Sequence, residues 1–359
     1  MTTATDITEP AGLEMRRCGQ SQLWLPALGL GCWQFGGGDY WGDQNQSDVN
    51  QVVRRAIDLG VTYFDTAEVY NVGRSETSLG EALQGIARDK LIIGSKISPS
   101  NTAPTALVNH CEASLKRLRT DYIDLYLVHW PITPAAIAHF TEEKGCPSVP
   151  EAFATLMELR AQGKIRFIGV SNFGMRPLRE ALDTGAEIAV NELPYNLLAR
   201  AIEHEILPFC RQNGICVIGY MALHQGVLAD IYPTLENVPV WQRRTRHFNA
   251  ARAGDLCRHK GEGAEKETNE ALDSIRAICK THGMSMPEAA IRWAMANPAI
   301  SCVLAGSRNV RELEMNVAAA VRPLPAEIVN ELRDATDALL AVLGRSFDYY
   351  EHPSNDRTK

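Results

Sequence analysis

Short apolar runs alternate with longer amphipathic stretches along most of the chain. The short runs are rich in Val, Ile, Leu and Tyr and are continuously apolar, which is typical of strands buried on both faces of a parallel sheet. Eight runs of this kind predict strands at Ala27–Gly31, Thr62–Asp65, Leu91–Ser95, Ile123–Val128, Ile165–Val170, Glu187–Val190, Ile215–Tyr220 and Ser301–Ala305.

The stretches between these runs repeat their apolar residues at helical spacing. The predicted helices are Asp48–Leu59, Glu76–Gln84, Pro104–Arg117, Pro150–Gln162, Arg176–Leu182, Ala201–Gln212, Met286–Ala296 and Val310–Ala319. Helix-start and helix-end residues support them; these are Ser148, Pro150 and Glu151 at one start, and Gly60, Gly163, Gly214 and Gly283 at ends. Eight strands, each followed by a helix, favour an α/β fold of the closed (β/α)8 type, a TIM barrel.

Several segments lie outside this repeat. Met15–Pro26 is expected to form a hairpin that plugs the bottom of the barrel, and Ala326–Leu343 an extra helix outside it. Two long loops, Pro131–Val149 after the fourth strand and Met221–Glu265 after the seventh, would fall on the catalytic face.

One barrel domain is therefore expected over residues 15–343, after a disordered or extended N-terminus at 1–14. The tail over 344–359 is polar but contains Phe347, Tyr349 and Tyr350. A solvated terminus and a packed segment are both open interpretations of this tail.

Composition narrows the class of protein. The 359 residues are 45% hydrophobic and 22% charged, with a formal net charge of −7. This excludes a disordered chain and argues against binding to nucleic acid or to an anionic membrane. No apolar run is long enough for a membrane span, and no secretory signal is visible. The nine cysteines include no Cys-x-x-Cys pair, so no metal site is expected and a reducing cytoplasm fits best.

Four polar side chains stand at the carboxyl ends of consecutive predicted strands. Asp65 ends the second strand and Tyr70 follows it, Lys96 ends the third, and His129 follows the fourth. In a parallel barrel these ends lie on one rim. A lysine and an aspartate near the core must pair. The Lys96 ammonium is then expected to lower the pKa of Tyr70, so that the phenol exchanges a proton near neutral pH.

Each of the four also has a simpler structural interpretation. Asp65 alone suits a turn or a helix cap, and Tyr70 suits the wall of a cavity. Lys96 suits a surface charge and His129 a buried histidine with a packing role. Their arrival on one rim favours a joint catalytic role.

Longer motifs follow one another along most of the chain. They are Leu28–Gly31, the Asp-Thr-Ala-Glu-Val-Tyr run at 65–70, Lys96, the run 121–131 that ends in His-Trp-Pro, Gly-Lys-Ile-Arg at 163–166, Gly-Val-Ser-Asn-Phe at 169–173, Tyr-Asn-Leu-Leu at 195–198, Tyr220, Gly306-Ser307-Arg308 and Asn316. From about residue 15 to 340 the chain resembles the aldo-keto reductase superfamily, which comprises nicotinamide-dependent oxidoreductases on a (β/α)8 barrel.

The resemblance implies a catalytic tetrad of Asp65, Tyr70, Lys96 and His129, with Tyr70 as the general acid. Hydride would pass from nicotinamide to a carbonyl carbon while Tyr70 protonates the oxygen, and Tyr70 and His129 would stabilise the alkoxide. Relatives that reduce carbon–carbon double bonds carry a glutamate at the histidine position. His129 therefore favours a carbonyl substrate.

The resemblance also implies where the cofactor binds. Ser171 and Asn172 would bind the carboxamide, and Tyr220 would stack on the nicotinamide. Glu192 replaces the glutamine that is usual in the family, and a carboxylate accepts hydrogen bonds but has no N–H to donate. The remaining implied contacts are Gly31, Trp33, Met221, Leu223, Gly226, Leu228, Glu312 and Asn316.

Gly306, Ser307 and Arg308 are predicted to start the helix after the eighth strand. A helix N-terminus with these residues suits an anion, here the adenosine 2′-phosphate, so NADP(H) is favoured over NAD(H). The simpler interpretation of Arg308 is an exposed arginine at a helix start.

Substrate walls are expected from Trp33, Trp41 and Trp130, with Phe140 nearby. Such walls suit sugars and aryl aldehydes alike. The basic residues over 241–260 have two interpretations: they form a solvated loop or subunit contact, or one or two of them bind an anionic group of the cofactor or substrate. Arg243 and Arg246 are the pair whose charge reversal would test the second.

The predicted function is NADPH-dependent reduction of an aldehyde or ketone, with a small carbonyl compound as the partner. One alternative is a sugar or polyol dehydrogenase that works in oxidation with NAD(P). Another is a regulatory subunit that senses the cofactor with little turnover. A phosphate-sugar isomerase on the same fold is the third, which the Tyr70–Lys96 pair argues against. A homo-oligomer stays open.

Overall fold

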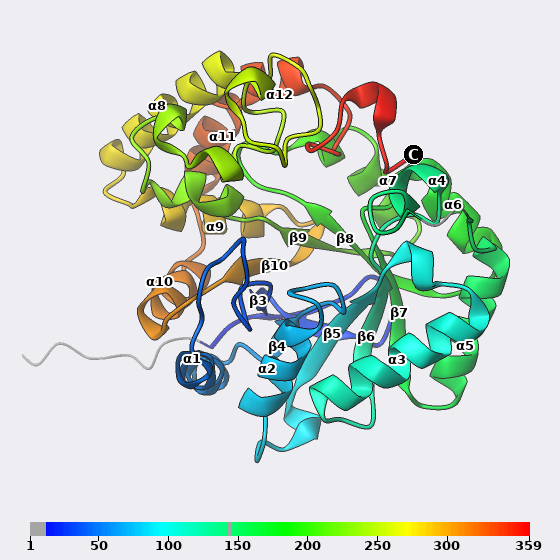
Figure 1. Cartoon of the computed structure of the whole chain (residues 1–359). Helices are drawn as coiled ribbons and strands as arrows, with labels where there is room; N and C mark the ends of the chain where they lie inside the picture. The colour runs from blue at the N-terminus through cyan, green and yellow to red at the C-terminus, as the bar shows by residue number, and fades with distance from the viewer. Residues whose placement is uncertain (1–11, 143–144) are drawn as a thin grey trace, which may run out of the picture.

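Eight parallel strands close into a barrel in the computed structural model of the chain, which describes residues 12–142 and 145–359 (Figure 1). Strands pair in the order β10–β3–β4–β5–β6–β7–β8–β9, so chain order is also spatial order. They are β3 (Leu28–Gly31), β4 (Tyr63–Asp65), β5 (Ile92–Ile97), β6 (Ile123–Val128), β7 (Ile165–Ser171), β8 (Ile188–Pro194), β9 (Cys216–Tyr220) and β10 (Ile300–Gly306). The predicted closed (β/α)8 barrel is confirmed.

The expected hairpin precedes the barrel. β1 (Met15–Arg17) pairs antiparallel with β2 (Trp24–Pro26). Buried Leu23 and Leu25 belong to the same apolar cluster as the residues that fill the barrel interior. The Gln20 N–H donates to the Gly214 carbonyl, 2.9 Å away, in the turn that leads into β9. The hairpin therefore plugs the end of the barrel where the strands begin, and the opposite end stays open for a site.

Helices surround the barrel on the outside (Figure 1). In α1, buried apolar residues recur at the spacing of one helical face, and a second, larger apolar cluster fills the space between the helices and the strands. The helices up to the last strand are α1 (Gln46–Asp58), α2 (Arg74–Ala82), α3 (Pro104–Leu118), α4 (Pro134–Ile137), α5 (Val149–Ala161), α6 (Met175–Asp183), α7 (Ile206–Gln212), α8 (Glu265–Thr281) and α9 (Met286–Ala296). After β10 come α10 (Val310–Ala320), α11 (Ala326–Asp334) and α12 (Asp337–Leu343).

The sequence-based prediction misses α8 and merges other elements. α8 begins after Ala264, which provides no side-chain cap, so the usual N-cap signal is absent. The predicted helix Ala326–Leu343 is two helices. They separate at buried Thr336, whose hydroxyl accepts a hydrogen bond from Arg200 Nη1 at 2.9 Å. The predicted helix Ala201–Gln212 is a short 3-10 turn followed by α7.

The tail over 344–359 is packed against the barrel, so the solvated interpretation is wrong. Phe347 and Tyr349 are buried, and buried Arg357 donates two hydrogen bonds of 2.8 Å to Asp348. The Gly174 N–H, just before α6, donates to the Thr358 carbonyl at 2.8 Å. The expectation for residues 1–14 lies largely outside the described residues. Within residues 12–142 and 145–359, no helix combines the length and apolar character that a membrane crossing requires.

Candidate active site

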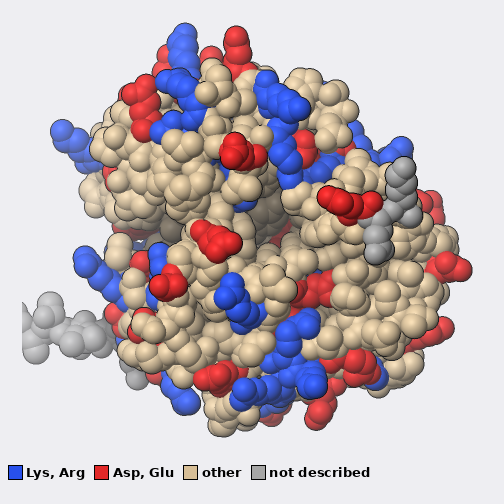
Figure 2. Space-filling model, viewed as in Figure 1, with Lys and Arg blue, Asp and Glu red and all other residues tan. Residues whose placement is uncertain are grey.

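A cavity of about 1300 Å³ opens at the carboxyl ends of the strands. Figure 2 shows the hollow near the middle of this face. The cavity is large enough for a dinucleotide and a small substrate together. The predicted site residues that line it are Gly31, Trp33, Trp41, Asp65, Tyr70, His129, Trp130, Phe140, Ser171, Asn172, Glu192, Tyr220, Met221, Leu223, Gly226, Gly306, Arg308, Glu312 and Asn316.

Three predicted site residues do not line the cavity. Lys96 is fully buried behind Asp65 and Tyr70. Leu228 is fully buried in the outer apolar core, so its side chain does not face the cavity, and its contact with the cofactor stays a prediction. Ser307 is buried, and its hydroxyl accepts a hydrogen bond from Asn316 Nδ2 at 3.1 Å. Ser307 therefore helps to position Asn316, and its own contact with the cofactor stays a prediction.

Lys96 lies at the centre of the polar cluster that links β4, β5 and β8. Its Nζ is 2.5 Å from Asp65 Oδ1, 3.0 Å from the Thr66 carbonyl and 3.4 Å from the Tyr70 hydroxyl. Glu192 Oε1 on β8 lies 3.3 Å from the same nitrogen. The lysine therefore faces two carboxyl groups, whereas sequence reasoning gave it only Asp65. Burial alone would lower the pKa of Lys96, but Asp65 and Glu192 outweigh it and raise the pKa, so the ammonium keeps its proton.

The expected lowering of the Tyr70 pKa is wrong as a net effect. Burial raises the pKa of Tyr70 most, Lys96 lowers it, and the carboxylates Asp65 and Glu192 raise it again. The result lies above the usual value for a tyrosine. Tyr70 is therefore a protonated phenol in the resting site, and Lys96 only reduces the rise in its pKa.

Glu192 holds a proton of its own at neutral pH. Burial and the neighbouring Asp65 raise its pKa to about 8, against the opposing effect of Lys96. Glu192 Oε2 is buried and has no hydrogen-bond partner among the described residues, and the side chain borders the cavity. A protonated carboxyl here carries both a donor and an acceptor, as the glutamine of the family pattern would.

His129 is a neutral imidazole. Burial lowers its pKa well below the usual value, and Lys96 lowers it further. Its Nδ1 is buried without a partner among the described residues, and its ring lies 5.6 Å from the Tyr70 ring, edge to face. The two side chains thus border one spot in the cavity where a polar atom of a ligand can bind.

The ends of β7 and β9 form a connected amide and hydroxyl network. Asn172 Nδ2 donates to the His129 carbonyl and to Ser171 Oγ, both at 3.0 Å. The Tyr220 hydroxyl donates to Asn172 Oδ1 at 2.8 Å. Asn172 has a φ of 63°, a left-handed conformation that asparagine tolerates better than most residues. These bonds fix the predicted carboxamide-binding residues in place beside His129.

The turn after β10 differs from the prediction by a few residues. α10 starts at Val310, and Asn309 caps it by accepting from the Glu312 N–H at 3.0 Å, so Gly306 to Arg308 precede the helix. Arg308 is exposed at the cavity rim, where its Nη2 donates to the Asp43 carbonyl at 3.1 Å. The Glu312 carboxylate accepts from the Arg308 N–H at 2.9 Å. A ligand phosphate here would meet a cation and an anion together.

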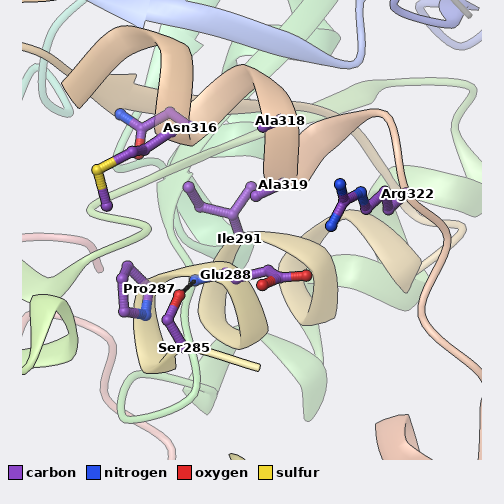
Figure 3. Close-up of a pocket in the computed structure, with 9 residues that line it drawn as sticks. Ser285, Pro287, Glu288, Ile291, Asn316, Ala318, Ala319 and Arg322 are labelled. Carbon is purple, nitrogen blue, oxygen red and sulfur yellow. Dashed lines mark hydrogen bonds between the residues drawn. The ribbon is translucent and has the colours of Figure 1, made fainter. Parts of the chain in front are cut away.

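A smaller pocket continues this end of the cavity. It has a volume of about 180 Å³ and lies between α9 and α10, where Figure 3 shows Asn316 opposite Pro287. Pro287, Met315 and Asn316 border both hollows. This small pocket is therefore part of the same cleft.

Tyr350 and Arg357 of the tail were not predicted as cavity residues, and Arg244 and Arg258 were predicted only as members of the basic loop over 241–260. Arg244, Arg258, Tyr350 and Arg357 line the cavity.

Arg243 and Arg246, whose charge reversal would test anion binding by the basic loop, have structural roles instead. Arg243 donates to the carbonyls of Glu236, Val238 and Arg252. Arg246 donates to the carbonyls of Leu343 and Ser346, which ties the loop to the tail. The aromatic residues of the tail and the basic loop were the available signals, but neither shows which side chains face inward.

Comparison with known proteins agrees with this geometry. The model of the Aldo/keto reductase family matches residues 27–337. The NADH-specific methylglyoxal reductase of Escherichia coli (strain K12) is 30% identical over 340 residues, which cover 89% of this chain and 98% of the relative. Methylglyoxal reductase YeaE of the same organism is 40% identical over 203 residues, covering 56% of this chain and 65% of the relative.

A solved structure gives the same result. An aldo-keto reductase from Klebsiella pneumoniae in complex with NADPH superimposes with a TM-score of 0.66 at 25% identity, covering 97% of this chain and 99% of that one. The family match includes every strand of the barrel. The chain therefore belongs to the aldo/keto reductase family and is an NAD(P)H-dependent oxidoreductase that reduces carbonyl compounds.

Proposed function

We propose that this protein reduces an aldehyde or ketone to the alcohol with NADPH, and that Tyr70 is the general acid. The proposal rests on the position of Tyr70. Its hydroxyl lies 3.4 Å from Lys96 Nζ, and its side chain faces the same cavity as His129. A carbonyl oxygen bound between Tyr70 and His129 would accept hydrogen bonds from both, and these bonds strengthen as the oxygen gains negative charge.

Tyr70 supplies the proton in this proposal. Its raised pKa keeps the phenol protonated at neutral pH, and the Lys96 ammonium stabilises the phenolate that remains after transfer. Reduction starts from the phenol, whereas oxidation of an alcohol must start from the phenolate. The resting protonation state therefore favours reduction over the dehydrogenase alternative.

His129 would orient the carbonyl oxygen without competing as an acid. Because its imidazole is neutral, it can donate one hydrogen bond but has no easily released second proton. Asn172 Nδ2 holds the His129 backbone carbonyl at 3.0 Å, which fixes where the ring stands.

The cavity residues fit a nicotinamide ring and its carboxamide. Tyr220 offers a face for the ring, and the unpartnered Glu192 Oε2 offers an acceptor for an amide N–H. Ser171 and Asn172 border the same spot. When bound, NADPH supplies the hydride that the carbonyl carbon receives. The chain's own part is to orient the ring, exclude water and hold the proton on the Tyr70 oxygen.

Aromatic side chains surround the place of the substrate. Trp33 packs against Tyr70 with ring centroids 5.8 Å apart, and Trp41 packs edge-on against Trp33 at 5.3 Å. Trp130 borders the cavity beside His129. Such walls suit small or aryl carbonyl compounds, and two relatives are named as methylglyoxal reductases.

The direct test follows NADPH consumption with methylglyoxal, glyceraldehyde and benzaldehyde. We expect the alcohol to form in an amount equal to the NADPH consumed. A protein that binds NADPH tightly but yields almost no alcohol in a single turnover with every aldehyde would instead be a cofactor sensor, and the proposal would be wrong.

Arg308 is expected to supply the preference for NADPH. Replacing it by alanine removes the cation at the cavity rim, so KM for NADPH should rise roughly tenfold while KM for NADH changes little. Glu312 opposes a 2′-phosphate, and its presence keeps the expected preference modest. The measurement is KM for both cofactors at a saturating aldehyde concentration.

Arg311 provides the matched control for Arg308. It is exposed one residue into α10 and does not line the cavity, so Arg311→Ala should leave both KM values unchanged. Equal KM changes for NADPH and NADH in Arg308→Ala would show that Arg308 does not recognise the phosphate.

Glu192 is expected to make stability depend on pH. Its pKa is about 8 in the native state against 4.5 as the ordinary value, so the native chain holds a proton between these pH values that the unfolded chain has released. The free energy of unfolding should therefore fall as pH rises through this window. Glu192→Gln removes this titration, so its Tm should decline less than that of the wild type between about pH 6 and pH 8.5.

Glu187→Gln controls for the loss of a carboxylate beside the same strand. Glu187 precedes β8 and its side chain is 82% exposed, so the variant should follow the wild-type pH profile. If Glu192→Gln also follows that profile, Glu192 is already ionised in the native protein at pH 6.

A further inference from the structure

Three arginines border the substrate end of the cavity. Arg244 and Arg258 come from the long loop after β9, and Arg357 comes from the tail. Two of these charges are neutralised by the tail itself. The Arg357 guanidinium donates two hydrogen bonds to the Asp348 carboxylate, and its central carbon lies 3.9 Å from the centroid of the Trp130 ring. Arg258 Nε lies 2.6 Å from Glu351 Oε1.

Arg244 has no such carboxylate. Within the described part of the chain, no acidic side chain lies within ion-pair distance of its guanidinium, and its buried Nε has no hydrogen-bond partner. Three aromatic rings surround it instead: Tyr40 at 4.3 Å, Tyr350 at 5.4 Å and Trp33 at 5.8 Å. These rings offset part of the cost of removing a cation from water, but they do not neutralise it.

The position of Arg244 relative to Tyr70 defines what a ligand must look like. Trp33 contacts both residues. The Arg244 guanidinium lies 5.8 Å from the centroid of the Trp33 ring, and the Tyr70 ring centroid lies 5.8 Å from the same point. The proposed proton donor and the unneutralised cation therefore lie beside the same aromatic side chain. A ligand with its carbonyl at Tyr70 could therefore reach Arg244 with a group carried on a linker of the size of a benzene ring.

We propose that Arg244 binds a carboxylate of the substrate, so that the enzyme prefers aldehydes or ketones that carry a carboxylate about one ring length from the carbonyl. This inference rests on the proposed carbonyl reduction at Tyr70. The planar guanidinium matches a carboxylate with two parallel hydrogen bonds, and the surrounding rings suit an aryl or short unsaturated linker. Arg258 and Arg357 are already paired with Glu351 and Asp348, so they shape the wall and leave Arg244 as the unneutralised cation.

The test compares 4-formylbenzoate with its uncharged methyl ester. We expect the wild type to have a higher kcat/KM for the acid than for the ester. In Arg244→Met, the ratio of the two kcat/KM values should fall roughly 10- to 100-fold, mainly through KM for the acid, because a charge-assisted pair is lost. Arg244→Lys should retain part of the ratio, since it keeps the charge without the planar donor pair.

Arg252→Met is the matched control. Arg252 lies on the same loop but is paired with Glu236 and Glu265 and does not border the cavity, so its removal changes net charge equally and should leave the ratio unchanged. Equal losses for acid and ester in Arg244→Met would make Arg244 a wall residue only. A rise confined to KM for NADPH would assign it to a cofactor phosphate. Either result overturns the proposal.

A binding measurement separates this inference from the proposed function. Quenching of tryptophan fluorescence by 4-(hydroxymethyl)benzoate reports carboxylate binding without turnover, and we expect Kd to rise in Arg244→Met by the same factor as KM for the acid. If neither aldehyde is reduced, the carbonyl reduction is wrong, while the binding measurement still decides on Arg244. If the ester is reduced and the carboxylate binds equally to both proteins, only the Arg244 proposal is wrong.

Discussion

Tyr70→Phe is expected to lower kcat by roughly 10²–10⁴-fold, the usual contribution of a positioned general acid. The variant keeps the ring, and with it the contacts to Trp33 and His129, but loses the hydroxyl 3.4 Å from Lys96 Nζ. Binding of NADPH should therefore be retained while proton transfer fails. The measurement is single-turnover reduction of benzaldehyde with prebound NADPH, together with the Kd for NADPH.

Two further observations make this prediction specific to the acid role. Because Tyr70 is a protonated phenol at neutral pH, wild-type reduction should lose rate only well above pH 7, where the phenol begins to ionise. The residual rate of Tyr70→Phe should not show this decline at high pH. A kcat within a few-fold of the wild type would instead show that another group or water supplies the proton.

Local, periodic patterns account for what could be predicted from the sequence. The barrel strands are short apolar runs that continue for one strand length. Asp65 and Lys96 stand at the ends of such runs, and His129 directly follows one. Tyr70 lies in the loop after β4. In a parallel barrel, every strand end faces the same rim, so the order along the chain is sufficient to bring Asp65, Lys96 and His129 together.

The electrostatics of the site depends instead on a contact across the barrel. Glu192 lies on β8 and Lys96 on β5, three strands apart, and nothing in either local sequence indicates that their side chains meet at 3.3 Å. Burial raises the pKa of Tyr70 most, and Asp65 and then Glu192 add to this rise against the opposing effect of Lys96. A prediction that weighed the Lys96 ammonium without the burial of the phenol therefore gave the wrong sign.

The sequence also could not show which arginines of the loop after β9 line the cavity. The loop after β9 has no period, and which of its arginines faces inward is decided by the tail that packs on it. Arg246 is drawn to the Leu343 and Ser346 carbonyls, whereas Arg244, two residues earlier, lies against Tyr350 and faces the cavity. Composition indicated a basic loop but could not separate these two roles.

Lys96→Met should affect both stability and activity. It leaves the carboxyls of Asp65 and Glu192 buried together without their cation, a change that costs about 3–5 kcal/mol in the free energy of unfolding for typical buried pairs. The loss should grow as pH rises, because each proton released leaves an uncompensated charge. Urea unfolding at several pH values measures this loss of stability, and Lys116→Met, at an exposed position, is the control.

Adding Asp65→Asn to Lys96→Met should recover part of the stability but not kcat. A double variant no more stable than Lys96→Met would show that packing, not charge, explains the loss of stability.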